Sequence, residues 1–317
     1  MYSLFGLLSA ATVALAATIP VRRADVCNGD ARLCSRSYGN VTFAGSHDRK
    51  VYLIFRCDWA FAFSTNPLAL SRDQEVDLTK QLDLGIRLLQ AQSHVEDGQL
   101  HFCHTSCALF DGGLVVDYLK TVKTFLDANP NEVLTLIFTN PENQSPSKVW
   151  KPLFDEAGIS DLAFVPPSIP VKQADWPTLG EMIDSGKRVV VFLDALADGP
   201  ESVDFILPEF QMIWETPFTV TDDKFPCKID RIGGPLSAGD HMYMINHSLN
   251  KNILPFIGDG VLVSDPIDAP RINGVDSIMA HAAGCAPLGA DRNPNFVLLD
   301  FVNKGDAFTA VRQLNGL

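Results

Sequence analysis

The order in which apolar and amphipathic segments follow one another constrains the fold of this chain most strongly. Short apolar runs of strand length alternate with segments that have helical periodicity. The expected strands are Val41–His47, Ile86–His94, Leu100–His104, Val133–Asn140, Leu162–Val165, Arg188–Asp194, Phe210–Trp214 and Phe296–Phe301. The expected helices are Asp73–Leu84, Val115–Ala128, Lys148–Ala157, Leu179–Ser185, Gly239–Asn250 and Asp306–Leu314.

A repeated strand-then-helix order predicts a mainly parallel sheet with helices outside it. About eight strands in 317 residues favour a closed TIM-type (β/α)8 barrel over an open doubly wound sheet. The sequence has neither a G-x-G-x-x-G run nor a Walker A run, which an open nucleotide-binding sheet would carry. We therefore expect an α/β barrel, with Ala195–Asp204 and Lys251–Ala290 as long loops.

The N-terminal segment has the pattern of a secretory signal peptide. Residues 1–17 contain the apolar run LFGLLSAATVALAA and end in small residues. This run is shorter than the roughly 20 apolar residues that a membrane-spanning helix needs. Arg22 and Arg23 form a dibasic cleavage signal, so residues 18–23 are a candidate propeptide. We expect residues 24–317 to form one secreted domain.

The charge of the chain limits its partners. It has 25 Lys and Arg against 38 Asp and Glu, which gives a formal net charge of −13. A nucleic-acid partner is not expected, because phosphate tracking requires a surplus of cations. Attraction to anionic lipid by charge is not expected either, so peripheral membrane contact would rely on exposed apolar loops. The aromatic-rich segment Val51–Phe63 is the candidate for that contact.

The seven cysteines fit a secreted protein whose thiols are mostly paired. The number is odd, and Cys57 is our candidate for the unpaired residue. Zinc binding is disfavoured because no pair of C-x2-C motifs occurs. Spacing indicates three pairs without fixing them, Cys27 with Cys34, Cys103 with Cys107 and Cys227 with Cys285. Glycosylation sequons that fit the same compartment begin at Asn40, Asn143 and Asn246.

Candidate catalytic residues lie where the expected strands end, because the chemistry of a parallel barrel sits at that rim. The first strand ends in His47, which Asp48 follows, and the third ends at His104. Asp300 lies near the end of the last strand. Two imidazoles and two carboxylates at one rim can take and give protons near neutral pH. Each residue alone has a structural explanation, and only their joint occurrence favours an active site.

The other histidines need no catalytic role. His101 and His281 are explained as structural or surface residues. His241 and His247 fall on an expected helix, where solvent or packing accounts for them.

The chain resembles secreted fungal PLC-like phosphodiesterases in the runs GSHD, QLDLGIRLLQAQSH, FCHTSC, PNEVLTLIFTNPEN and FVLLDFVNKGDAFTAVRQLN. These proteins belong to the superfamily of phosphatidylinositol-specific phospholipase C, defined by its X domain. The resemblance extends from Cys27 to about Leu314 and implies an irregular TIM-type barrel.

The resemblance also implies roles for the four rim residues. His47 resembles the general base that takes the proton of the inositol 2-hydroxyl, so that this oxygen attacks phosphorus and forms a cyclic phosphodiester. Asp300 would orient His47. His104 resembles the general acid for the leaving oxygen, with Asp48 as its carboxylate partner. The implied substrate is a phosphatidylinositol-like or GPI phosphodiester, and neither a metal nor another cofactor is implied.

Two departures from the family pattern bear on activity. By strand alternation Gln90, Gln92 and His94 share one face of the second strand, and we assign them to substrate binding. Gln92 stands where bacterial relatives have an arginine and calcium-dependent relatives an acidic ligand, so the site lacks a charge. Loss of one such donor costs about 10²–10³ in rate. The second departure is Arg49–Trp59, which looks inserted as a longer loop or a retained intron.

Three function classes remain. The favoured one is a secreted phosphoric diester hydrolase, which we expect to be monomeric. The alternative is a catalytically weakened barrel that binds a lipid headgroup or another surface partner. Glycoside hydrolysis would need two carboxylates across a sugar site, for which Asp194 and Glu215 are the candidates.

Overall fold

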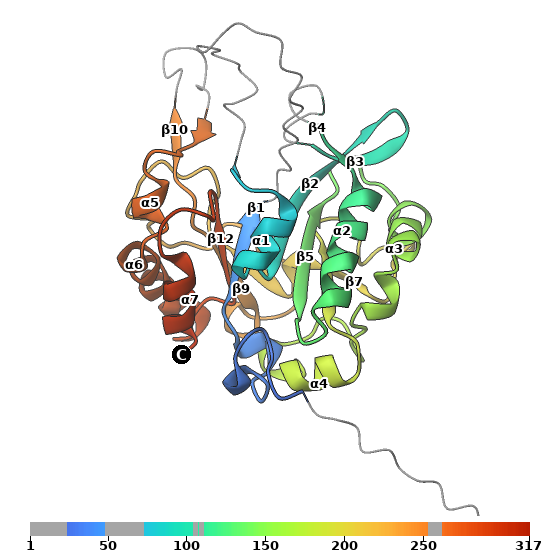
Figure 1. Cartoon of the computed structure of the whole chain (residues 1–317), viewed down its shortest axis with the longest axis horizontal. Helices are drawn as coiled ribbons and strands as arrows, with labels where there is room; N and C mark the ends of the chain where they lie inside the picture. Colours follow the sequence, from blue (N-terminus) through green and yellow to red (C-terminus); the bar gives the residue numbers. More distant parts are fainter. Residues whose placement is uncertain (1–23, 48–72, 104–106, 108–110, 253–261) are drawn as a thin grey trace, which may run out of the picture.

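A parallel sheet curled into a half-barrel organises the computed structural model, which describes residues 24–47, 73–103, 107, 111–252 and 262–317 (Figure 1). Along the sheet the strand order is β7-β6-β5-β2-β1-β12-β9-β8, and each neighbouring pair is parallel. No ladder joins the end strands β7 and β8, so the barrel is open between them in the part described. The strands are β1 (Phe43–His47), β2 (Leu88–Glu96), β5 (Leu134–Thr139), β6 (Val189–Leu193), β7 (Ile206–Pro208), β8 (Ile213–Glu215), β9 (Met242–Asn246) and β12 (Phe296–Leu299).

Successive residues of these strands enter two different hydrophobic cores. Leu88, Val190 and Leu298 belong to the core inside the barrel. Their neighbours Leu89, Val191 and Val297 belong to the core between the sheet and the outer helices. Burial on both faces explains why the strands are continuous apolar runs in the sequence.

Helices cover the outer face of the sheet (Figure 1). In α2 (Val115–Ala128), Val115, Leu119, Val122 and Leu126 are buried at helical spacing. The other α-helices are α1 (Leu78–Leu84), α3 (Lys151–Ala157), α4 (Leu179–Asp184), α5 (Ala269–Ile272), α6 (Val275–Cys285) and α7 (Ala307–Leu314), and a π-turn at Pro146–Trp150 leads into α3. Single 3-10 turns lie at Ala31–Leu33, Tyr38–Asn40, Ser160–Leu162, Gln173–Asp175, Glu209–Gln211, Ala238–Asp240 and Ala286–Gly289.

An antiparallel ribbon extends beyond the rim of the sheet, formed by β2, β3 (Gln99–Cys103) and β4 (Asp111–Leu114) (Figure 1). Asp97 and Gly98 connect β2 to β3 with φ angles of 49° and 78°. An Asp-Gly pair suits such a turn because both central residues need a positive φ. The prediction of a barrel strand at Leu100–His104 was therefore wrong, since this segment turns back on β2. A separate antiparallel pair joins β10 (Asn250–Asn252) to β11 (Leu262–Ser264).

Four further predictions are corrected by the structure. The expected helix Gly239–Asn250 is strand β9, because a short apolar run such as MYMIN does not distinguish a buried strand from a buried helix. The expected strand Leu162–Val165 forms only one bridge, from Ala163 to Val189. The expected strand Phe210–Trp214 starts later, as β8, after a 3-10 turn, and β7 was missed. The expected loop Lys251–Ala290 contains α5 and α6.

The described residues form three disulfides, and they are the pairs that spacing indicated: Cys27–Cys34, Cys103–Cys107 and Cys227–Cys285. Such bonds form in oxidising compartments, which agrees with the expectation of an extracellular protein. Cys57 lies outside the described residues, as do residues 1–23 and the segments Arg49–Trp59 and Val51–Phe63. Among the described helices, none has the length and apolar character required to cross a membrane.

Candidate active site

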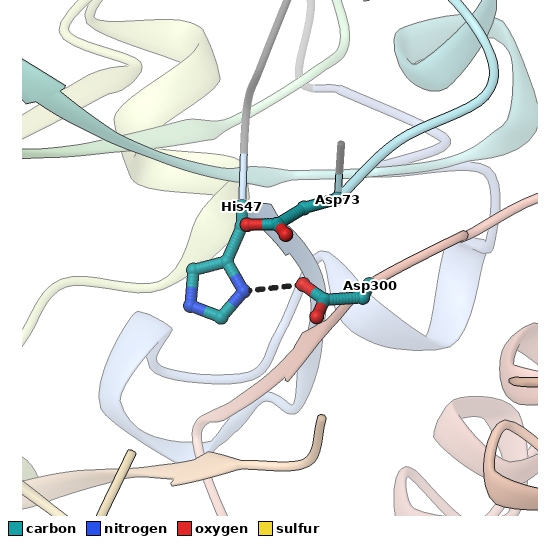
Figure 2. Close-up of side chains that lie close together, drawn as sticks. All are labelled: His47, Asp73 and Asp300. Carbon is teal, nitrogen blue, oxygen red and sulfur yellow. Dashed lines mark hydrogen bonds and ion pairs between the residues drawn. The ribbon is translucent and has the colours of Figure 1, made fainter. Parts of the chain in front are cut away.

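His47 and Asp300 meet at the rim of the barrel because their strands are neighbours. Strand β1 pairs with β12 in parallel, and Ser46 lies opposite Leu299. The residues that follow them, His47 and Asp300, are therefore side by side. The imidazole Nδ1 lies 2.6 Å from a carboxylate oxygen of Asp300 (Figure 2). The His47 side chain is 20% exposed and that of Asp300 is 7% exposed. When Nδ1–H donates to the carboxylate, Nε2 carries the basic lone pair.

A set of hydrogen bonds fixes the turn that carries Asp300. The side-chain amide of Gln74 donates to the carbonyl of Leu299 at 2.9 Å and accepts from the amide of Val302 at 3.0 Å. Asn273 donates its side-chain amide to the carbonyl of Asp300 at 2.8 Å. Both amide side chains are buried. We call Gln74 and Asn273 the clamp, because they hold the turn on both sides.

The turn itself has an unusual backbone. Phe301 has a φ of 49°, in the left-handed region that a bulky side chain rarely adopts. Its amide donates to the carbonyl of Asp73 at 2.7 Å, and its own carbonyl accepts from Asn273 at 3.1 Å. The surrounding contacts therefore hold a conformation that the residue alone would not favour.

Asp73 adds a second carboxylate to the site, which sequence analysis missed. It is buried, and its carboxylate accepts a hydrogen bond from the Ser264 hydroxyl at 2.5 Å. One ligand atom from each of His47, Asp73 and Asp300 lies within 4.8 Å of the others (Figure 2). Among the described residues this is the only such group of three that could hold a metal ion. A test of activity must therefore include a chelator.

One of the predicted substrate-binding residues on β2 lies beside His47. Gln90 is the register partner of His47 in the pairing of β1 with β2, and it is half-buried. Gln92 and His94 lie further along the same strand, with Gln92 exposed. His94 hydrogen-bonds through Nδ1 to Glu142 at 2.7 Å.

Two of the predicted catalytic residues, Asp48 and His104, lie outside the described residues. Asp48 follows the last residue of β1, and His104 follows the last residue of β3.

The carboxylates considered for glycoside hydrolysis form a cluster in which Asp194, after β6, is half-buried and Glu215, at the end of β8, is buried. Glu215 is 1% exposed and is ion-paired with Arg231. Burial raises the pKa of Asp194, and burial followed by the nearby charge of Glu215 raises the pKa of Glu209 well above its usual value. Because Glu215 is enclosed and already paired, this cluster does not provide two carboxylates across an open sugar site.

His247 and His281 form a second buried cluster. Their Nδ1 atoms lie 2.9 Å apart, and Nε2 of His247 donates to the carbonyl of Ile272 at 2.9 Å. The Phe225 ring packs against both imidazoles, with centroids 4.3 and 5.0 Å away. Burial lowers the pKa of His247 to about 4 and that of His281 to about 3. Both rings are therefore neutral packing groups, as expected, although His247 follows a strand instead of lying on a helix.

Comparison with known proteins relates this chain to proteins that contain a PI-PLC X domain. The family model described as PI-PLC X matches residues 33–315. PI-PLC X domain-containing protein 1 of Arthroderma benhamiae is 40% identical over 322 residues, which covers 98% of this chain and 96% of that relative. An uncharacterized secreted protein of the same fungus is 37% identical over 293 residues, covering 91% of this chain and 62% of that protein.

The fold also has a solved counterpart. The phosphatidylinositol-specific phospholipase C from Listeria monocytogenes superposes with a TM-score of 0.54, covering 90% of this chain and 95% of the bacterial chain. Sequence identity is 13%, so this likeness concerns the fold. It agrees with the TIM-type barrel predicted from the order of strands and helices.

Proposed function

The chain belongs to the PI-PLC X domain family, and from that membership we propose that it is a secreted phosphoric diester hydrolase of the phosphatidylinositol-specific phospholipase C type. Its proposed substrate is a phosphatidylinositol-like or GPI phosphodiester. The observation that supports this most is the 2.6 Å hydrogen bond between His47 and Asp300 at the rim where barrel chemistry occurs. Residues 24–317 would act as a single, monomeric domain after removal of residues 1–17 and 18–23.

In the proposed reaction His47 is the general base. Its Nε2 takes the proton of the inositol 2-hydroxyl, and that oxygen attacks phosphorus as the bond to the lipid oxygen breaks. His104 gives a proton to the departing oxygen, and Asp48 supports His104. Asp300 accepts the Nδ1–H of His47 and stabilises the imidazolium that forms. In a second step the roles reverse, and water opens the cyclic phosphodiester.

The neutral residues of the second strand would bind the substrate. The amides of Gln90 and Gln92 can donate hydrogen bonds to hydroxyl or phosphoryl oxygens, but they bring no charge. His94 completes this set. The mechanism uses no metal and no other cofactor, and we propose that the segment Val51–Phe63 contacts the membrane.

The second candidate function is a barrel that binds a lipid headgroup without cleaving it. Gln92 favours this alternative, because an amide replaces the preorganised charge that stabilises a phosphoryl transition state. The hydrogen-bonded pair of His47 and Asp300 favours the hydrolase.

The test is release of inositol phosphate from phosphatidylinositol micelles by the purified chain, with and without EDTA, beside a His47→Ala variant. We expect turnover that survives EDTA and disappears in the variant. Turnover that EDTA abolishes would instead assign the group of His47, Asp73 and Asp300 to a metal ion. Headgroup binding without turnover by a folded sample would favour the second candidate.

A further inference from the structure

We infer that His94 and His101 form a binding site for one divalent transition-metal ion, such as Zn²⁺, on the ribbon beyond the barrel rim. This site is separate from the group of His47, Asp73 and Asp300, and it does not rest on the proposed function; with an ion bound, His94 is a metal ligand and does not contact the substrate. The inference starts from the register of the ribbon. His94 on β2 lies directly opposite His101 on β3 in an antiparallel pair. Opposed residues project from the same face with Cβ atoms about 4.5–5.5 Å apart, so two imidazoles here can share a ligand.

Each imidazole is oriented by a carboxylate at Nδ1. His94 Nδ1 lies 2.7 Å from Glu142, and His101 Nδ1 lies 2.9 Å from Asp111. A carboxylate accepts hydrogen bonds, so Nδ1 carries the proton and the neutral ring presents its lone pair at Nε2. Histidines that bind metals almost always donate their other ring N–H to such a partner, which fixes the tautomer and raises the basicity of the ligand atom.

The candidate ligand atoms are the two Nε2 atoms. Neither ring has a hydrogen bond through Nε2 to another residue in the described part of the chain. The rings are only 19% and 16% exposed, so their positions are restricted by neighbours. Two oriented lone pairs on one face therefore remain available as ligands.

The charge of the cluster favours a cation over an anion. With neutral imidazoles, Glu142 and Asp111 carry two negative charges, and neither forms an ion pair with a lysine or arginine of the described residues. A divalent ion would neutralise both. Nitrogen ligands favour Zn²⁺, Cu²⁺ or Ni²⁺ over Mg²⁺ or Ca²⁺, which prefer oxygen. Water would complete the coordination.

The metal site lies apart from His47 and Asp300, and its position on the ribbon predicts what a bound ion would stabilise. His94 is four residues beyond Gln90, the register partner of His47, or about 13 Å along the strand. A bound ion would join β2 to β3 and, through Glu142, to the segment after β5. Because β3 ends at Cys103, next to His104, metal binding would stabilise the ribbon that leads into the predicted general acid.

Isothermal titration of the metal-free full chain with ZnCl2 tests this inference. We expect one ion per chain, with affinity at least about tenfold lower in His101→Gln and in His94→Gln. Glu142→Gln should weaken binding by about 10–100-fold, because it removes only the orienting partner. Glu96→Gln, an exposed carboxylate change on the same ribbon, is the matched control and should bind Zn²⁺ normally.

Circular dichroism of each variant establishes that it is folded. Three results would overturn the inference: no Zn²⁺ binding by the wild-type chain, binding that both histidine variants retain, or binding that only His47→Asn abolishes. Thermal stabilisation by inorganic phosphate and not by Zn²⁺ would also contradict it, since it would identify the pair as an anion site.

Discussion

Two side-chain pairs, His47 with Asp300 and His247 with His281, differ in partner and burial although each includes a histidine at or just after the end of a barrel strand. His47 ends β1 and hydrogen-bonds to a carboxylate, with 20% of its side chain exposed. His247 follows β9 and hydrogen-bonds to a second imidazole, His281, in the interior. A carboxylate partner stabilises the protonated ring, whereas burial beside another imidazole disfavours it. A histidine at a strand end is therefore not enough to identify a general base. The partner of the ring and its exposure distinguish a candidate base from a packing group.

The two pairs are nevertheless connected. His247 donates to the carbonyl of Ile272, and the next residue, Asn273, is the part of the clamp that donates to the carbonyl of Asp300. The neutral pair thus supports the segment that positions the candidate catalytic carboxylate. Substitutions in the first pair should change chemistry, and substitutions in the second should change stability.

The largest expected effect is loss of the general base. His47→Asn should lower kcat for phosphatidylinositol cleavage by about 10⁴-fold, at the upper end of what general base catalysis contributes. The melting temperature should stay close to that of the wild type, because the side chain lies at the rim. Steady-state kinetics and calorimetry on the same sample measure both. A variant with near-normal kcat would remove the distinction between the two pairs.

The second effect concerns the partner of the base. Asp300→Asn should reduce kcat by about 10²–10³-fold, within the range that general acid–base catalysis contributes, because a neutral amide no longer stabilises the imidazolium or fixes its tautomer. The pH dependence of kcat should change as well, since the ring loses its negative neighbour. Asp306→Asn, just beyond the same turn, is a control that should retain activity. Equal losses in both variants would indicate damage to the turn instead.

The third effect is acid sensitivity from the buried pair. The folded pKa of His247, about 4, lies below the unfolded value of about 6.5, so the unfolded chain binds protons first as pH falls. Stability is therefore full above about pH 6.5 and declines between there and pH 4, by about 3 kcal/mol for this one group. Urea unfolding from pH 7.5 to 4.5 measures the decline.

His281→Gln provides the comparison for this pH series, because glutamine can donate to His247 without titrating. The variant should lose less stability than the wild type over the same range, with unchanged activity at pH 7.5. Parallel curves would show that other groups cause the acid sensitivity.

The smallest effect tests the clamp. Gln74→Leu leaves the carbonyl of Leu299 and the amide of Val302 without their partner, at a cost of about 1–3 kcal/mol. Because this residue acts through Asp300, we expect kcat to fall about tenfold with KM unchanged and the pH profile to shift. Gln74→Glu keeps one acceptor and should recover part of the rate. A change in melting temperature without any change in kcat would limit Gln74 to a structural role.

Much of the barrel could be predicted from the sequence, because its central strands are buried on both faces and are continuous apolar runs. The strands near Val41–His47, Val133–Asn140 and Arg188–Asp194 and the helix Val115–Ala128 agree with the structure. The helix predicted over the run MYMIN was wrong because a short apolar segment shows neither strand nor helix periodicity. The antiparallel ribbon was not predicted because the turn signal at Asp97 and Gly98 was overlooked.

The site was partly predictable for a similar reason. Strand order places the ends of β1 and β12 together, so His47 and Asp300 could be paired by topology alone. Asp73, Gln74 and Asn273 could not, because they reach the turn from loops distant in sequence. The pairing of His94 with His101 depends on the register of the hairpin. It could not be predicted while Leu100–His104 was assigned to a parallel barrel strand.

The most direct test of the proposed two-histidine chemistry, in which Asp300 orients the base His47, is ³¹P NMR of phosphatidylinositol vesicles incubated with the purified chain in EDTA. The mechanism requires a cyclic inositol phosphodiester to appear first and to convert slowly to the open phosphate, with neither signal formed by His47→Asn. An open phosphate formed without the cyclic intermediate, or a cyclic product still formed by His47→Asn, would contradict it.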